Sequence, residues 1–181
     1  LRDDYKVRNG SENGYEEYLQ KLKSSAHLQA MQEEIESNIV KLPIELFAMK
    51  DLDGNTVDLS RMKGKILVLD FWATWCAPCK ASFPGMQMAV DKYADDENVE
   101  FFFIATMETA PDYKAEIRKF LKSKDVVYSR YCKDFHFSGI PQKLIVDGDG
   151  YLRYRSTGYH GSPSALVDEI SFVIEYLKNE N

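Results

Sequence analysis

A short apolar run that ends just before two cysteines constrains the fold of this chain more than any other feature. The run "KILVLDFWA", residues 65–73, is far shorter than the roughly 20 apolar residues of a membrane helix and predicts a buried strand. Cys76 and Cys79 follow it, and apolar residues then recur at helical spacing from about residue 77 to residue 93. This order of strand, Cys-x-x-Cys and helix predicts that Cys76 lies at the N-terminus of a helix.

A cysteine at a helix N-terminus has an altered acidity. Unpaired backbone N–H groups and the positive end of the helix dipole both favour the thiolate over the thiol. Cys79 lies one helical turn after Cys76, within reach of a disulfide, and Pro78 removes a donor that the first turn would leave unpaired. The spacing therefore favours a dithiol that alternates between reduced and oxidised forms.

The rest of the chain predicts an α/β domain preceded by a helical segment. Residues 1–42 form a polar extension that turns helical from residue 15, and a shift of register at Ser24 and Ser25 indicates two short helices or one bent helix. Residues 43–181 form the main domain, in which a first hairpin precedes the order β-α-β-α-β-β-α. The expected elements are a hairpin at 44–60 turning at 51–55, strands at 65–72, 99–106 and 126–128, helices at 77–93 and 112–123, a hairpin at 143–158 turning at 147–150, and a last helix with Ser162 as N-cap and Pro163 at its first position.

Composition excludes some classes of function. The 181 residues carry a formal charge of −6 and show no basic patch, which argues against a nucleic-acid partner. The apolar runs are too short for a membrane span. The chain begins without an initiator Met or an apolar signal core, so we expect a processed product or part of a longer protein.

The segment "DFWATWCAPCKASFP", residues 70–84, closely resembles the active site of the thioredoxin superfamily. The preceding "DLDGNTVDLSRMKGKILVLDFWATWC", residues 51–76, is similar to its TlpA/ResA-type branch of extracytoplasmic thiol–disulfide oxidoreductases. The resemblance covers about residues 43–178. It implies a thioredoxin-like three-layer α/β sandwich with an N-terminal β-hairpin, protein disulfides as substrates, and a membrane or soluble redox partner that recharges the protein. It also implies no cofactor and a periplasmic or other extracytoplasmic location.

The resemblance assigns roles to the two cysteines and to the residues between them. Cys76 matches the attacking cysteine and Cys79 the resolving one, so the pair would form the redox-active disulfide. Trp75 matches the flat aromatic residue beside the site. Ala77 and Pro78 would also face the substrate, and this dipeptide resembles the Gly-Pro of reducing thioredoxins, which favours a reductase.

The sequence "SGIP" matches a second part of the family's site. Its proline, Pro141, is cis in the family and lies against the disulfide, although cis is a minority state of X–Pro bonds in general. Ile140, just before it, would offer backbone hydrogen bonds to a bound substrate chain.

One position departs from the family pattern. TlpA/ResA-type proteins often carry a glutamate three residues after the second cysteine, where this chain has Ser82. Asp70 could supply a buried carboxylate instead, since it interrupts an apolar strand. As an unpaired buried acid it would be costly, so its replacement by asparagine is expected to stabilise the protein. The alternative is a strand-end aspartate that reaches water.

Several other interpretations remain open. Cys132 and His136 could complete a Cys₃His zinc site with Cys76 and Cys79, although the two pairs belong to different segments and we predict no metal. A permanent disulfide would close too small a loop to constrain the unfolded chain much.

Two further alternatives concern the class of function. A peroxiredoxin-type thiol peroxidase shares the fold, but its Pro-x-x-x-Thr-x-x-Cys pattern is missing here. A thioredoxin-fold binding module would have an inert dithiol. We expect Cys132 to be a buried bystander and assign no site to His27, His136 or His160.

Overall fold

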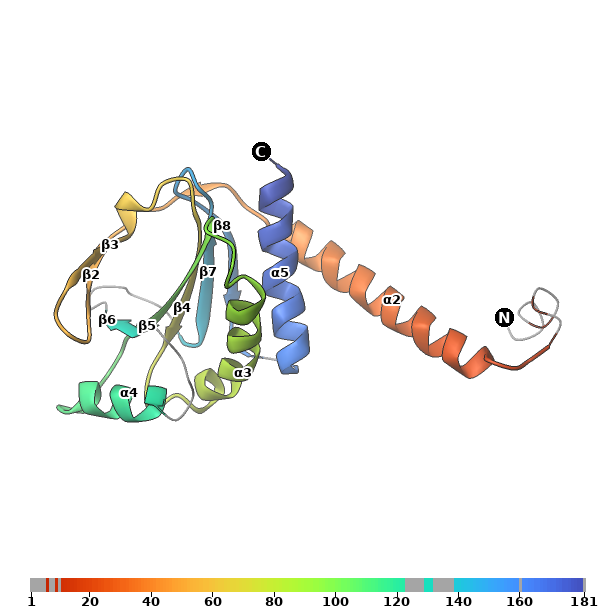
Figure 1. Cartoon of the computed structure of the whole chain (residues 1–181), viewed down its shortest axis with the longest axis horizontal. Helices are drawn as coiled ribbons and strands as arrows, with labels where there is room; N and C mark the ends of the chain where they lie inside the picture. Colours follow the sequence, from red (N-terminus) through yellow and green to blue (C-terminus); the bar gives the residue numbers. More distant parts are fainter. Residues whose placement is uncertain are drawn as a thin grey trace. The chain divides into compact units, whose positions relative to one another are not determined.

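The computed structural model describes residues 6, 9, 11–122, 129–131, 139–159 and 161–180. The chain divides into two compact units, residues 1–37 and 38–181. In the first unit, a single uninterrupted helix, α2 (Tyr15–Ser37), runs through both serines (Figure 1). The Ser25 hydroxyl donates to the carbonyl of Leu22 at 2.9 Å, a local bond that a helix tolerates. Of the two alternatives that the sequence left open, two short helices are therefore excluded, because one helix spans Ser24 and Ser25.

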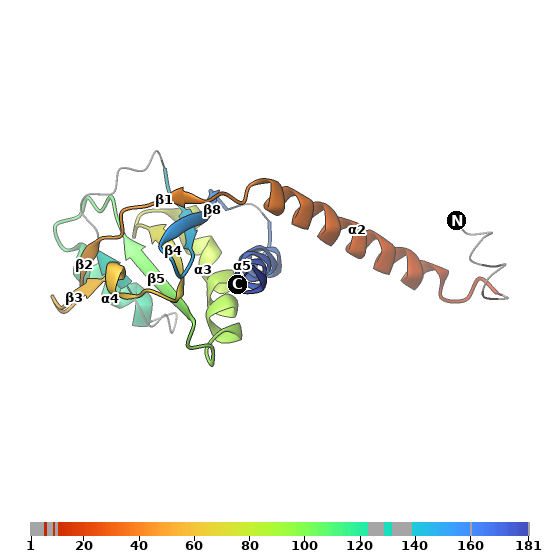
Figure 2. The same cartoon turned by 90° about the horizontal axis from the view of Figure 1, so that it is seen from above.

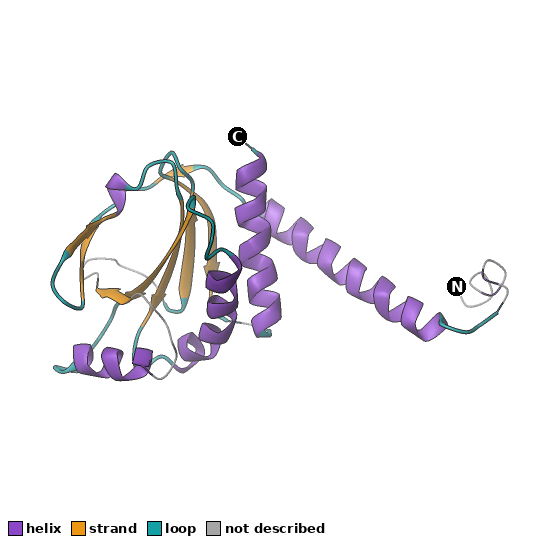
Figure 3. Cartoon of the chain, in the orientation of Figure 1, coloured by secondary structure: helices purple, strands orange, loops and turns teal. Residues whose placement is uncertain are grey.

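The described part of the second unit is built on one mixed sheet with helices packed against it (Figure 3). The strands follow the order β1-β8-β7-β4-β5-β6-β2-β3 across the sheet, which places β4 near its centre. The strands are β1 (Leu42–Pro43), β2 (Ala48–Asp51), β3 (Thr56–Asp58), β4 (Ile66–Trp72), β5 (Val99–Ala105), β6 (Ser129–Tyr131), β7 (Gln142–Val146) and β8 (Tyr151–Thr157), and the helices are α3 (Ala77–Lys92), α4 (Tyr113–Lys122) and α5 (Pro163–Asn179).

Most expected elements are confirmed. Both hairpins form, and the Ser162 hydroxyl caps α5 by accepting from the backbone N–H of Ala165 at 3.2 Å. The strand expected at 126–128 lies outside the described residues. The sequence pattern missed β1, which is only two residues long, contains a proline, and pairs with the start of β8.

The two faces of β4 point into different cores because side chains alternate along a strand. Leu67, Leu69 and Phe71 face a core that the first hairpin and the segment before it cover. Asp70 and Trp72 point to the opposite face, where the Trp72 ring lies 4.9 Å from that of Phe83 on α3. Figure 2 shows α3 and α5 together on this side of the sheet. The strand thus delivers Asp70 beneath the helix that carries the cysteines.

Helices α3 and α5 pack tightly against each other at Gly85. A Cβ added there would lie 2.8 Å from the carbonyl oxygen of Pro163 and 3.1 Å from the Cβ of Leu166. We expect Gly85→Ala to lower the free energy of unfolding by about 1–3 kcal/mol, because overpacking outweighs the better helix propensity of alanine. Gly139→Ala is the control, since no atom of the described residues lies within 4 Å of its added Cβ. Urea unfolding of both variants tests this, and a Gly85→Ala variant at least as stable as wild type would contradict it.

Candidate active site

The two cysteines lie where the sequence predicts, at the start of α3. Cys76 is the N-cap, with φ −82° and ψ 100°, and its Sγ accepts the backbone N–H of Cys79 at 3.2 Å. A disulfide joins Cys76 to Cys79, whose Cα atoms are 5.3 Å apart. The sulfur of Cys76 therefore occupies the place of a capping oxygen, where the helix end favours negative charge.

The two cysteines are buried, whereas the tryptophan beside them is exposed. Cys79 is fully buried and Cys76 is 2 % exposed, whereas the adjacent Trp75 is 55 % exposed. Of the two residues, only Cys76 has any exposed surface. This agrees with the expected division into an attacking and a resolving cysteine, although the roles themselves remain a prediction.

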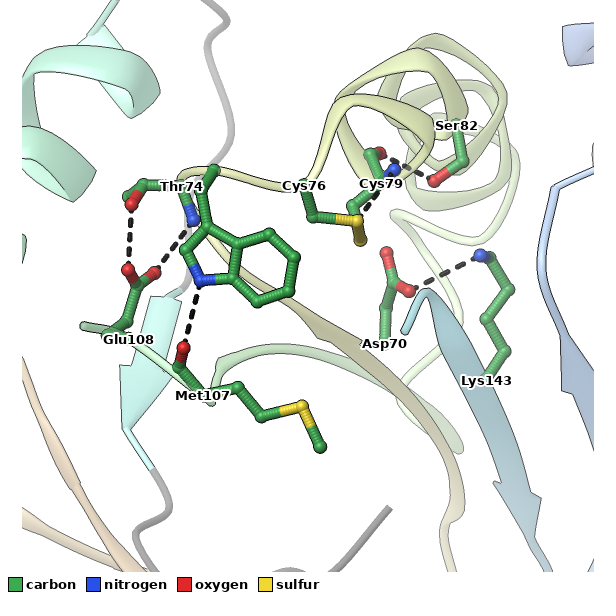
Figure 4. The surroundings of a disulfide bond; sticks show 9 residues. Asp70, Thr74, Cys76, Cys79, Ser82, Met107, Glu108 and Lys143 are labelled. Atoms are coloured by element: carbon green, nitrogen blue, oxygen red, sulfur yellow. Dashed lines mark hydrogen bonds and ion pairs between the residues drawn. A yellow bond between two sulfur atoms is a disulfide. The ribbon is translucent and has the colours of Figure 1, made fainter. Parts of the chain in front are cut away.

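A buried ion pair lies behind the cysteines. Asp70 on β4 and Lys143 on β7 are direct partners in the antiparallel register, and Lys143 Nζ lies 3.3 Å from Asp70 Oδ1. Both side chains are 1 % exposed, and the described residues give neither group a hydrogen-bond partner of ordinary geometry. In Figure 4 the Asp70 carboxylate points toward the cysteine pair. The alternative of a solvated strand-end aspartate is therefore wrong.

The environment of Asp70 changes its acidity. Burial raises the pKa of the carboxyl above its usual range, and the positive charge of Lys143 partly opposes this rise. The group can therefore hold a proton at a higher pH than an exposed aspartate can.

Of the other residues that the sequence analysis singled out, some lie within the described ranges and others lie outside them. The Ile140–Pro141 peptide bond is cis, as the family resemblance implies, and the Pro141 carbonyl accepts the backbone N–H of Gly158 at 2.8 Å. Ser82 is buried and donates to the carbonyl of Cys79 at 2.8 Å, so its hydroxyl is satisfied inside the helix. Cys132 and the histidines at 136 and 160 lie outside the described residues, as does the side chain of His27.

Sequence reasoning missed Lys143 and Glu108. Lys143 interrupts an apolar strand just as Asp70 does, and that shared anomaly was the available signal. It could be used only once the register of β7 against β4 was known. Glu108 accepts hydrogen bonds from both the backbone and the hydroxyl of Thr74, and it lies 34 residues away in the sequence, with no pattern that marks it.

Two features bear on the other interpretations. Within the described ranges, no group of three or more His, Cys, Asp or Glu side chains could hold a metal ion. No helix in that same part of the chain is long and apolar enough to cross a membrane.

Comparison with known proteins places the chain in a family. Residues 40–155, more than half of the chain, match the AhpC/TSA family. The chain belongs to the AhpC/TSA family. Among relatives in this thioredoxin-fold family, thiol-disulfide oxidoreductase ResA of Bacillus subtilis (strain 168) is 36% identical over 119 residues, which cover 62% of this chain and 64% of the relative. ResA of Bacillus cereus (strain ZK / E33L) is 28% identical over 111 residues, covering 58% and 61%.

Solved structures agree on the fold. The crystal structure of a thiol:disulfide interchange protein of the thioredoxin family from Chlorobium tepidum TLS matches with a TM-score of 0.58 and 20% identity, covering 76% of this chain and 97% of that chain. The thioredoxin-like fold and the resemblance to ResA are thus confirmed. The chain spans less than two thirds of the length of the two ResA relatives.

Proposed function

We propose that this member of the AhpC/TSA family is a thiol–disulfide oxidoreductase that reduces disulfides in other proteins. The observation that carries the proposal is the Cys76–Cys79 disulfide at the N-terminus of α3, with the Cys76 sulfur capping the helix. A permanent crosslink would gain little here, because the loop it closes is so short. A sulfur stabilised as a thiolate suits a pair that opens and closes.

The proposed reaction transfers two electrons from the reduced pair to a substrate disulfide. The Cys76 thiolate attacks one substrate sulfur, the substrate S–S bond breaks, and the departing sulfur leaves as a thiolate that takes up a proton. Cys79 then loses its proton and attacks the Cys76 sulfur of the mixed disulfide. The second substrate sulfur departs, and the Cys76–Cys79 disulfide remains.

Asp70 is proposed to accept the proton of Cys79. Both side chains are buried, and the raised pKa of Asp70 brings its proton affinity closer to that of a thiol than an exposed aspartate could offer. Lys143 balances the charge of the carboxylate before the proton arrives. Trp75, Ala77, Pro78, Ile140 and Pro141 are proposed to face the substrate chain.

Partners and location are part of the same proposal. The Ala77–Pro78 dipeptide favours the reducing direction, which requires a membrane or soluble partner that returns electrons to the pair. The resemblance to the TlpA/ResA-type branch supports a periplasmic or other extracytoplasmic location, and the ResA relatives are named thiol-disulfide oxidoreductases.

Equilibration in glutathione buffers tests the proposal directly. Free thiols are alkylated after equilibration and counted by mass spectrometry. We expect one two-electron transition that involves Cys76 and Cys79, and the reduced protein should then reduce a disulfide-containing protein stoichiometrically. A dithiol that stays oxidised in excess dithiothreitol would instead support the binding module. Rapid consumption of hydrogen peroxide, without transfer to protein disulfides, would support the peroxidase.

A further inference from the structure

The connection between β5 and α4 is bonded to the segment that leads into the cysteines. The Thr74 backbone N–H donates to Glu108 Oε1 at 2.8 Å, and the Thr74 hydroxyl donates to Glu108 Oε2 at 2.7 Å. The Trp75 indole N–H donates to the carbonyl of Met107 at 2.9 Å. Two consecutive residues of one loop thus hold the two residues that precede Cys76 (Figure 4).

The backbone of this loop is held in an uncommon conformation. Met107 has a φ of 54°, in the left-handed region that residues other than glycine rarely adopt. Such a conformation persists only where its surroundings fix it. Here the Met107 carbonyl receives the indole N–H, and the next residue, Glu108, binds Thr74 with both carboxylate oxygens. Hydrogen bonds to a carboxylate are among the stronger ones in proteins.

These bonds fix a side chain that packing does not. Trp75 is 55 % exposed, so packing covers less than half of its surface. Ordering an exposed side chain costs conformational entropy without a matching gain from burial. The cost is useful where a partner later binds, because a preordered side chain has less freedom left to lose on binding. The Met107 side chain is also partly exposed, at 37 %.

We propose that Glu108 is a positioning residue for substrate capture, which holds Trp75 in place through Thr74 and the Met107 carbonyl. The inference rests on the proposed function, since it specifies which residue prepares Trp75 for a polypeptide substrate. Both carboxylate oxygens of Glu108 accept hydrogen bonds from Thr74, so the residue acts on the site through that segment. Its loss should therefore affect the docking of a chain more than the chemistry of the thiolate.

The test compares a chain with a small molecule at the same cysteine. Probes are a ten-residue peptide whose single cysteine is joined to thionitrobenzoate, and hydroxyethyl thionitrobenzoate disulfide, which lacks a peptide. The reduced protein releases coloured thionitrobenzoate from each in a single turnover, and KM and kcat here denote the half-saturating probe concentration and the limiting rate of that release. We expect Glu108→Ala to raise KM for the peptide roughly ten-fold, which corresponds to the net contribution of about one hydrogen bond. The value of kcat should change less than about two-fold. The rate with the small disulfide should change less than about two-fold.

Two further variants serve as controls. One keeps the hydrogen-bonding groups at position 108 without the charge, and the other removes an acidic side chain elsewhere on the surface. Glu108→Gln should restore most of the peptide KM, since its amide can accept the Thr74 N–H and donate to the Thr74 hydroxyl. Glu97→Ala, which removes an exposed acid before β5 at the other end of the sheet, should leave both probes unaffected. Hydrogen exchange of the Trp75 indole N–H, followed by NMR and assigned with Trp75→Phe, should accelerate in Glu108→Ala only.

The outcomes distinguish this inference from the proposed function. An unchanged indole exchange rate in Glu108→Ala would show that Glu108 does not hold Trp75, whatever the activity. Faster exchange with an unchanged peptide KM would overturn the role in capture while the oxidoreductase function stands. A wild-type protein that releases thionitrobenzoate from neither probe would refute the proposed function, and the capture role with it.

Discussion

Serine at position 76 is expected to abolish disulfide reduction, whereas serine at position 79 is expected to trap the substrate on the protein. Cys76→Ser removes the sulfur of the only residue of the pair with any exposed surface. Because a hydroxyl at neutral pH is a far weaker nucleophile than a thiolate, the rate should fall by roughly a thousand-fold or more. Cys79→Ser leaves the attacking thiolate in place, but nothing then resolves the mixed disulfide.

Mass spectrometry under non-reducing conditions measures this division directly. Each variant is reduced, desalted and mixed with a disulfide-containing protein. The Cys79→Ser protein should gain the mass of a substrate chain, and dithiothreitol should remove it. Cys132→Ala serves as the control, since it changes the one remaining cysteine and should leave turnover unaltered. An adduct on Cys76→Ser would contradict the assignment of Cys76 as the attacking cysteine. So would an adduct on Cys79→Ser that disappears when Cys132→Ala is added to that variant.

The sequence was most informative where a pattern is local. Cys76, Pro78 and the apolar run before them place a dithiol at a helix N-terminus, because strand and helix periodicities change within a few residues. The cis bond at Pro141 came from family resemblance alone, since local sequence does not distinguish it from a trans bond. The fold and the position of the dithiol could thus be predicted together.

Contacts between distant strands could not be predicted in the same way. Asp70 and Lys143 meet only because β7 runs antiparallel to β4 in one particular register, which no local periodicity encodes. Glu108 and Thr74 meet through a loop whose path depends on the left-handed residue Met107. Hydrophobic patterning specifies which face of a strand is buried, and it leaves open which polar groups face each other there.

The buried partner reverses the stability expected for Asp70→Asn. An isolated buried acid would be better replaced, but Lys143 is 1 % exposed and has Asp70 as its ion-pair partner. Removing the carboxylate leaves the ammonium group buried without a compensating charge, which typically costs 3–5 kcal/mol. We therefore expect Asp70→Asn to be less stable than wild type by about 3 kcal/mol. The double variant Asp70→Asn/Lys143→Met should recover much of that loss, because both charges are gone.

The dependence of stability on pH identifies the carboxyl group. A pKa raised in the folded state means that the folded protein binds more protons than the unfolded chain, so this contribution to stability declines as pH rises from the ordinary range of aspartate toward the folded value. Lys143→Met removes the cation that opposes the rise of the pKa, so the decline should continue to higher pH. Urea unfolding of wild type, Lys143→Met and the double variant between pH 4 and 8 measures it. Parallel curves for the three proteins would contradict the proposed coupling.

Asp70 and Lys143 are expected to affect catalysis more strongly than stability. Asp70→Asn keeps the shape of the side chain and removes the proton acceptor, so the step in which Cys79 attacks the mixed disulfide should slow by about 10²-fold near neutral pH. The first attack by Cys76 should change far less, since its thiolate is stabilised by the start of α3. Stopped-flow measurement with the thionitrobenzoate peptide separates the two steps, because thionitrobenzoate leaves in the first and the peptide in the second. The double variant distinguishes an effect of the unpaired Lys143 charge from the loss of the proton acceptor. It should recover much of the stability but still lacks the acceptor, so its second step should remain slow. If the double variant regains the wild-type rate, the buried charge of Lys143 alone slows the single variant, and Asp70 is a structural counter-ion instead of the proton acceptor.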